Sequence, residues 1–188
     1  TLDNIAQIIP PCKSNHLELP RAMKPAGVLV LMFAKNGSVH VILNKRSDTV
    51  EHHKGEISFP GGAWESADKD LSCTATRETN EEMGIRYEDM RLIGELDTVN
   101  TSSMFCIYPF VATLSYPYKS RVSEAEVADV LEVPIQSLVD PINRRTEMHI
   151  RQNKSYKFYS YIYNGHIIHG ATARILSQLL AIIASKIT

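Results

Sequence analysis

The stretch from Asp70 to Gly84 constrains the fold of this chain more than any other part of its sequence. It predicts a helix over Asp70–Met83, and Gly84 follows where a left-handed residue commonly closes a helix. Weakly polar side chains share one stripe of this helix: Ala75, Thr76, Thr79 and Met83. Residues three and four apart share a face, so an arc of about 100° on another side gathers three carboxylates: Glu78, Glu81 and Glu82.

The grouped glutamates predict a cation site. An acidic helix face is most often simply solvated, but like charges at this spacing repel by about a few tenths of a kcal/mol per pair. The helix dipole also disfavours anions near the C-terminus. Upstream, Gly61 and Gly62 allow a ligand to approach the backbone closely. Hard ions such as Mg²⁺ or Mn²⁺ take carboxylate oxygens together with waters and substrate phosphates, so we expect one of them here.

The rest of the chain alternates between predicted strands and helices. Apolar, β-branched runs bounded by turn residues predict strands at Gly27–Ala34, Val39–Leu43, Met90–Ile93, Ile107–Leu114, Tyr156–Tyr163 and His166–Ile168. An apolar helix is predicted over Ala171–Ile187. Together these elements predict an α/β fold in which a mixed sheet is covered by helices.

The length of the chain, 188 residues, corresponds to about one domain. Residues 1–24 contain three prolines and little periodicity, so we interpret them as an N-terminal arm with one short amphipathic helix around Ile5. The single domain is then expected over residues 25–188.

Composition excludes several classes of protein. Lys and Arg total 20 and Asp and Glu total 21, so no basic field attracts nucleic acid or an anionic membrane. The apolar stretches are shorter than the roughly 20 residues of a membrane span. Three cysteines without CxxC spacing argue against a disulfide framework or a zinc site: Cys12, Cys73 and Cys106. We therefore expect a protein of the reducing cytoplasm, with neither a membrane nor nucleic acid as its partner.

The residues around the predicted helix resemble the Nudix box, in which a glycine and a spaced acid precede Arg-Glu-x-x-Glu-Glu-x-Gly and an aliphatic residue. Here the glycine is Gly62, the acid is Asp68, and the run Arg77-Glu-Thr-Asn-Glu-Glu-Met-Gly-Ile85 supplies the rest. Gly62 lies one position further from Arg77 than in the usual box, and Asp68 stands where glutamate is more common. Both departures resemble the coenzyme A pyrophosphatase branch of the family.

A second motif resembles the leader of the same branch, which has the form Leu-Leu-Thr-x-Arg-Ser, then Arg, Gly and Phe-Pro-Gly-Gly. Its counterparts are Ile42-Leu-Asn-Lys-Arg-Ser47, Gly55 and Phe59-Pro-Gly-Gly62. Asn44 replaces the threonine, and Glu51 replaces the second arginine. Near the C-terminus, Gly170–Leu176 is similar to the start of that branch's last helix.

The resemblance implies a Nudix-type α/β/α sandwich that hydrolyses a nucleoside diphosphate linked to another group with Mg²⁺ or Mn²⁺. By this analogy Glu78, Glu81 and Glu82 are the metal ligands. The implied substrate is coenzyme A or a derivative, giving adenosine 3',5'-bisphosphate and 4'-phosphopantetheine. A small nucleotide is the expected partner, either for a single chain or for a homodimer. ADP-ribose or another nucleoside diphosphate derivative is the alternative substrate, and a nucleotide-sensing module without catalysis is the alternative outside enzymes.

Further site residues are implied by the same analogy. The catalytic base is either Glu81 or a residue of a distant loop, where Glu126 is preferred over Glu124. Arg77 is expected to orient a glutamate or the loop through a salt bridge, near Gly61 and Gly62. Arg46 is either a phosphate contact or an ordinary ion-paired residue, and two loop histidines are either exposed or part of a lid: His52 and His53.

Overall fold

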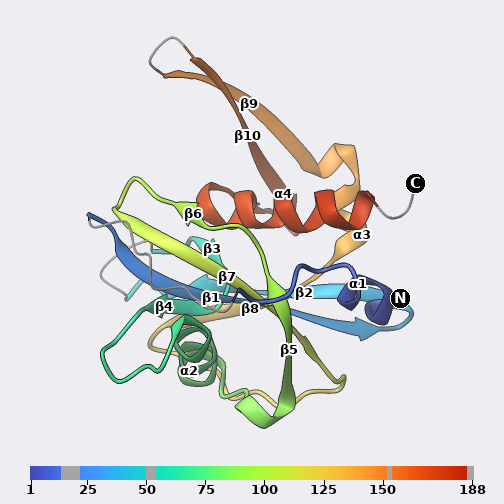
Figure 1. Ribbon diagram of the computed structural model, residues 1–188. Helices are drawn as coiled ribbons and strands as arrows, with labels where there is room; N and C mark the ends of the chain where they lie inside the picture. Colours follow the sequence, from blue (N-terminus) through green and yellow to red (C-terminus); the bar gives the residue numbers. More distant parts are fainter. Residues whose placement is uncertain (14–21, 50–53, 152–153, 186–188) are drawn as a thin grey trace.

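Two helices cover opposite faces of a β-sheet in the computed structural model of the chain (Figure 1). The structure describes residues 1–13, 22–49, 54–151 and 154–185. Helix α2 (Leu71–Met83) lies on one face, and helix α4 (Gly170–Ala184) lies on the other. The predicted α/β fold, a mixed sheet flanked by helices, is therefore confirmed.

The central sheet has eight strands and a main order of β3-β2-β1-β7-β5. Strand β4 pairs with β1, β6 pairs with β7, and β8 pairs with β2. Strands β1 and β7 run parallel and the other pairs are antiparallel, which makes the sheet mixed. The strand bounds are β1 (Lys24–Lys35), β2 (Ser38–Arg46), β3 (Ile57–Ser58), β4 (Gly61–Ala63), β5 (Met90–Glu95), β6 (Val99–Asn100), β7 (Phe105–Leu114) and β8 (Val127–Pro134).

Strands β1 and β2 separate part of the way along the sheet. They pair only between the turn and the Met32–Val41 contact. Beyond it β1 continues beside β4, and β2 continues beside β3. The segment from Ile57 to Ala63 therefore runs from one diverging strand to the other, and it carries the two glycines that the sequence singled out.

Side-chain alternation along β1 builds two cores. Leu29, Leu31 and Phe33 pack with the buried residues of α2 on one face. Val30 and Met32 pack on the other face, with the large aliphatic residues of α4. The period of two along a strand thus assigns each helix to its own side of the sheet.

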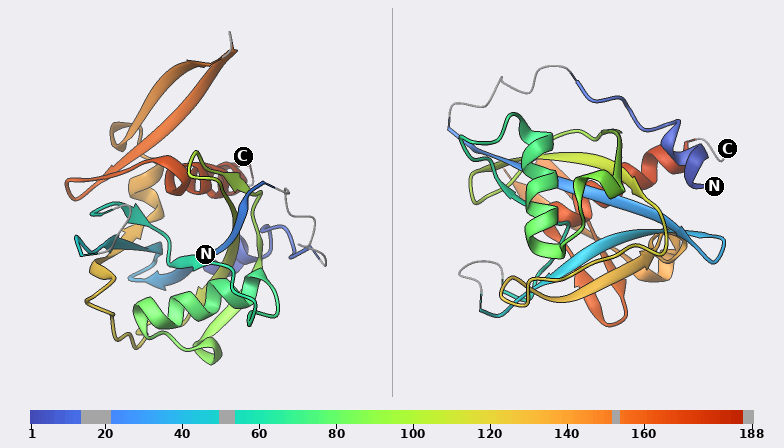
Figure 2. Two further views of the ribbon diagram at one scale, coloured as in Figure 1. Left: turned by 90° about the vertical axis from the view of Figure 1, so that its left-hand side faces the viewer. Right: turned by 90° about the horizontal axis from the view of Figure 1, so that it is seen from below.

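A second, three-stranded antiparallel sheet contains β9 (Arg144–Arg151), β10 (Lys154–Tyr163) and β11 (His166–Ile168). The ribbon of β9 and β10 projects from the body of the molecule and is drawn in orange in Figure 2. The sequence analysis did not predict strands β8 and β9, the short helix α3 (Ile135–Val139) or the short strands β3, β4 and β6. The last helix ends at Ala184, earlier than expected, and residues 186–188 lie outside the described part of the chain.

The start of the chain packs against the sheet. Helix α1 (Leu2–Ala6) contributes Ile5, and Ile9 follows it; both are buried in the core on the α4 side. The carbonyl of Pro10 accepts a hydrogen bond of 3.0 Å from the Glu95 amide on β5. The division into an arm over residues 1–24 and a domain after it stays a prediction. None of the helices that the structure describes has the length and hydropathy of a membrane span.

Candidate active site

Helix α2 has caps at both ends: the sequence predicted the cap at Gly84, whereas Asp70, expected inside the helix, caps its start. At its start, the Asp70 side chain accepts a hydrogen bond of 2.9 Å from the Cys73 amide. At its end, Gly84 adopts the left-handed conformation with φ 66°. These two residues fix where the helix begins and ends, and thereby which way its glutamates point.

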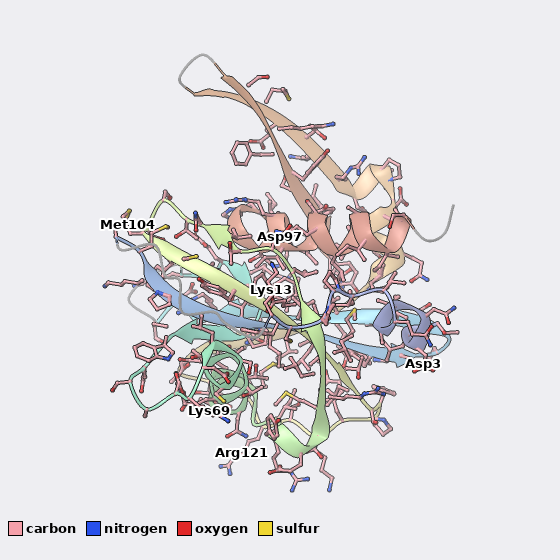
Figure 3. All side chains as sticks on the ribbon, in the orientation of Figure 1. Asp3, Lys13, Lys69, Asp97, Met104 and Arg121 are labelled. Atoms are coloured by element: carbon pink, nitrogen blue, oxygen red, sulfur yellow. The ribbon has the colours of Figure 1, made fainter. Side chains whose placement is uncertain are left out.

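The loop between β7 and β8 docks on the end of α2. The Arg121 amide donates to the Met83 carbonyl, and the Ser123 amide donates to the Glu82 carbonyl, each over 2.8 Å. Figure 3 shows Arg121 beside this end of the helix. Because the last carbonyls of a helix have no partner within it, they provide anchors for this loop. Glu126 follows a few residues later on the same loop.

Glu82 is buried, which differs from the expected separation of acidic and weakly polar faces. Its side chain is 6% exposed and lies on the same buried side of α2 as Thr79 and Met83. Atom Oε2 accepts hydrogen bonds from Asn44 Nδ2 over 2.8 Å and from the Gly61 amide over 3.4 Å. The helical pattern alone could not reveal these partners, since they come from the sheet.

Strand β2 supplies two polar side chains to the Glu82 carboxylate. Ile42 packs in the core on the α2 side, and alternation places Asn44 and Arg46 on the same face. Arg46 Nη1 lies 3.9 Å from Glu82 Oε1. The sequence identified Asn44 only as a departure from a motif; its spacing of two from Arg46 was the available signal that both face α2.

Arg77 connects the other two glutamates to the loop before the helix. Its Nη1 donates to Glu78 Oε1 over 2.9 Å and to Glu81 Oε2 over 3.0 Å. Its Nε and Nη2 bind both oxygens of Asp68. The expected salt bridges of Arg77 are therefore present. These bonds from Arg77 lower the pKa of Asp68 to about 2.

Glu78 packs directly against Gly62. A Cβ atom added at Gly62 would overlap the Glu78 carboxylate, so the backbone approaches this acid more closely than any side chain would allow. Burial raises the pKa of Glu78; Arg77 opposes this rise, while Glu81 and Glu126 add to it. Glycine is therefore needed at position 62 because a side chain there would displace the Glu78 carboxylate.

Burial also raises the pKa of Glu82 to about 7, against the opposing charge of Arg46. Both Glu78 and Glu126 raise it further. Glu126 is therefore close enough to interact electrostatically with Glu78 and Glu82. Glu126 itself is exposed, with its carbonyl held by the Ser47 amide over 2.8 Å. Glu124 is exposed on the same loop.

The donor chemistry of the site suits a hard divalent ion, although the carboxylates hold other partners. Within the described ranges, no three acidic, histidine or cysteine side chains converge as a ready metal cage. Arg77 draws Glu78 and Glu81 to one side, while Asn44 holds Glu82 on the other. All three offer the carboxylate oxygens that Mg²⁺ and Mn²⁺ prefer. Burial, with a smaller contribution from neighbouring acids, raises the pKa values of Glu78 and Glu82, and a bound cation would favour their charged forms. Glu51, which replaces an arginine of the leader motif, and the two loop histidines, His52 and His53, lie outside the described residues.

Known proteins share both the sequence pattern and the fold. The NUDIX domain family matches residues 23–157. The Nudix hydrolase NudL of Photorhabdus laumondii is 32% identical over 139 residues, which cover 74% of each chain. Nudix hydrolase 22, a chloroplastic protein of Arabidopsis thaliana, is 32% identical over 87% of this chain. The chain spans 56% of the length of that plant relative.

Solved structures show the same fold at low sequence identity. The Nudix hydrolase RenU of M. smegmatis superposes with a TM-score of 0.61 at 15% identity, over 87% of each chain. The NUDIX domain of Shewanella oneidensis NrtR, in complex with ADP ribose, superposes with a TM-score of 0.54 at 18% identity, over 92% of this chain and 95% of that one.

The family match covers most of the chain and includes the whole carboxylate helix and the glycine loop before it. The chain therefore belongs to the Nudix family, and it is a pyrophosphohydrolase that acts on nucleoside diphosphate derivatives.

Proposed function

We propose that this chain hydrolyses the diphosphate of coenzyme A or its derivatives, giving adenosine 3',5'-bisphosphate and 4'-phosphopantetheine. Two observations support the proposal. A buried carboxylate, Glu82, lies beside further acids and one arginine, a charge arrangement suited to a phosphate held by cations. The leader motif around Arg46 resembles the coenzyme A branch, and it lies on the strand that contacts Glu82.

Nudix hydrolases generally need divalent metal ions. We propose that Glu78, Glu81 and Glu82 hold Mg²⁺ or Mn²⁺, which when bound neutralises the diphosphate and lowers the pKa of the attacking water. Arg77 orients Glu78 and Glu81 through its hydrogen bonds. Arg46 binds a substrate phosphate through its guanidinium, because this side chain is 28% exposed and lies 3.9 Å from the proposed metal ligand Glu82.

The proposed reaction breaks one P–O bond of the diphosphate. The water oxygen forms the new bond to phosphorus, and the former bridging oxygen leaves with the other phosphate. Glu81 or Glu126 accepts the proton from the water, and the exposure of both leaves them accessible to it. The buried Glu82 is less suited to this step, because Asn44 and Gly61 already occupy one of its oxygens.

ADP-ribose is the second candidate substrate. A protein with the same fold, the NUDIX domain of NrtR, is described in complex with ADP ribose. Both substrates contain an adenosine diphosphate, and they differ at the 3'-phosphate and the group beyond the diphosphate. Recognition of that phosphate therefore separates the two candidates.

A substrate panel with product analysis tests this proposal. We expect turnover of coenzyme A, with Mg²⁺ or Mn²⁺, to exceed that of 3'-dephospho-coenzyme A and ADP-ribose. Preference for ADP-ribose would replace the coenzyme A assignment. Glu82→Gln should lower kcat about 100-fold while the fold survives, and the exposed Glu88→Gln is the matched control. Unchanged turnover in Glu82→Gln would refute the role of this acid.

We also propose a cytoplasmic location. The oligomeric state, a single chain or a homodimer, is a separate question for measurement. The three cysteines are free thiols in the structure, which suits a reducing compartment. Size-exclusion chromatography with light scattering distinguishes one chain of 21.1 kDa from two.

A further inference from the structure

Asn44 is a buried polar residue that the sequence motif does not explain. It lies on β2, opposite Ser58 of β3 on one side and Val130 of β8 on the other. Its relative exposure is 1%, and its neighbour on the same face of the strand, Ile42, is a core residue. An amide in such a position is costly unless it makes hydrogen bonds, so its partner indicates what it does.

That partner is Glu82. Asn44 Nδ2 donates to Glu82 Oε2 over 2.8 Å, and the Gly61 amide approaches the same oxygen at 3.4 Å. The other oxygen, Oε1, faces Arg46 at 3.9 Å, beyond hydrogen-bond reach. The two oxygens of Glu82 are therefore not equivalent: the sheet and the glycine loop hold one, and the second is directed toward the arginine.

The amide differs in reach from the threonine found at this position in the branch that the leader resembles. A threonine hydroxyl is attached at Cβ, whereas the Asn44 amide nitrogen lies one atom further along the side chain. That atom carries the donor toward α2. The Oδ1 atom of Asn44 has no hydrogen-bond partner among the residues that the structure describes, so the contact with Glu82 is the bond that this amide makes.

We propose that Asn44 is a positioning residue that fixes Oε2 of Glu82 and leaves Oε1 as the single oxygen this glutamate offers to a divalent ion. The proposal rests on the proposed role of Glu82 as a metal ligand. Partners that orient a ligand in this way typically change metal affinity about 10- to 100-fold when removed. Asn44 acts through Glu82 and does not touch the substrate.

Mn²⁺ binding to the protein without substrate tests the proposal directly. The free Mn²⁺ signal in electron paramagnetic resonance gives the dissociation constant for the wild type, Asn44→Ala and Asn44→Thr. Val41→Ala is the matched control, because Val41 lies on the same strand, is fully buried and packs in the opposite core. Thermal unfolding of each variant shows that it is folded, and Asn44→Thr provides a second variant if Asn44→Ala is unfolded.

We expect both Asn44 variants to bind Mn²⁺ about 10- to 100-fold more weakly than the wild type, with kcat at saturating substrate lowered and KM for the nucleotide little changed. Val41→Ala should lose stability and keep the wild-type dissociation constant. Wild-type Mn²⁺ affinity in folded Asn44→Ala or Asn44→Thr, or equal weakening in Val41→Ala, would overturn the proposal. A wild type that binds Mn²⁺ but cleaves no diphosphate substrate would instead overturn the proposed function, since the Mn²⁺ comparison would still stand. A wild type without Mn²⁺ binding would overturn both.

Discussion

Arg77 and Asp68 form a two-point ion pair, with Nε 2.9 Å from Oδ1 and Nη2 3.0 Å from Oδ2. Asp68 also accepts hydrogen bonds from the Thr74 hydroxyl over 2.9 Å and from the Glu65 amide over 3.1 Å. One acid therefore connects the loop before α2 to its first turns and holds the arginine that contacts the helix glutamates. Asp68 thus acts on Glu78 and Glu81 through Arg77.

Asp68→Asn should lower the free energy of unfolding by about 2 kcal/mol, because it removes a charged partner from several hydrogen bonds. Urea unfolding followed by circular dichroism measures this change. Glu65→Gln, an exposed substitution in the same loop, is the control and should stay within about 0.5 kcal/mol of the wild type. An equal loss in both variants would show that the loop tolerates no change of any kind.

The contribution of Asp68 should disappear in acid. Its pKa is about 2 in the folded protein and about 3.9 in an unfolded chain. A folded pKa below the unfolded one stabilises the protein above the unfolded pKa, and this stabilisation is lost as pH falls through the folded value. The difference in unfolding free energy between the wild type and Asp68→Asn should therefore be constant above about pH 5 and shrink between about pH 4 and 2. A difference that stays constant across that range would contradict the ion pair.

Gly62→Ala should impair turnover far more than stability. The added methyl group would occupy the position of the Glu78 carboxylate, which must then move away from Arg77. A displacement of this kind can lower kcat about 100-fold. Steady-state kinetics with coenzyme A measures the loss, and Ala63→Ser at the exposed next residue is the control. Normal kcat in Gly62→Ala would mean that Glu78 has no fixed position during catalysis.

Ile9→Ala should lower the free energy of unfolding by about 2–4 kcal/mol, because it opens a cavity beneath the start of the chain. Ile9 is 5% exposed and shares a core with the residues of α4. Chemical denaturation checks the value, with Gln7→Ala, an exposed change nearby, as the comparison. If Ile9→Ala were as stable as the wild type, the first residues would be an appendage that the domain does not need.

Tyr118→Phe should lower the free energy of unfolding by about 1.5 kcal/mol and leave kcat unchanged. The Tyr118 hydroxyl donates to Glu132 Oε1 over 2.7 Å, and Lys35 binds the other oxygen of that acid. Burial raises the pKa of Glu132, but these two bonds outweigh it and the net pKa is lowered. Thermal unfolding and a turnover assay, with the exposed Tyr87→Phe as control, separate the two effects. A reduced kcat would place this cluster in the catalytic machinery.

Most elements could be predicted because their signals are local. The cap of α2 at Gly84 and the apolar runs of β1 and β7 depend on neighbouring residues only, and all of them are present. Strands β8 and β9 were missed because charged residues interrupt their patterns, such as Asp129 on β8. Strand β8 pairs with β2, which lies far earlier in the chain and outside any short window of sequence, whereas β9 pairs with the next strand, β10.

The sequence by itself determined that three glutamates share one region of a helix after a glycine turn, because helical spacing depends on the sequence order alone. Only the tertiary structure decided that Glu82 turns inward to Asn44, a residue 38 positions earlier in the chain, while Glu78 and Glu81 stay with Arg77 of the same helix. The physical reason is that burial and opposite charges act across space. Whether an acid is solvated or desolvated therefore depends on which strand lies beneath it.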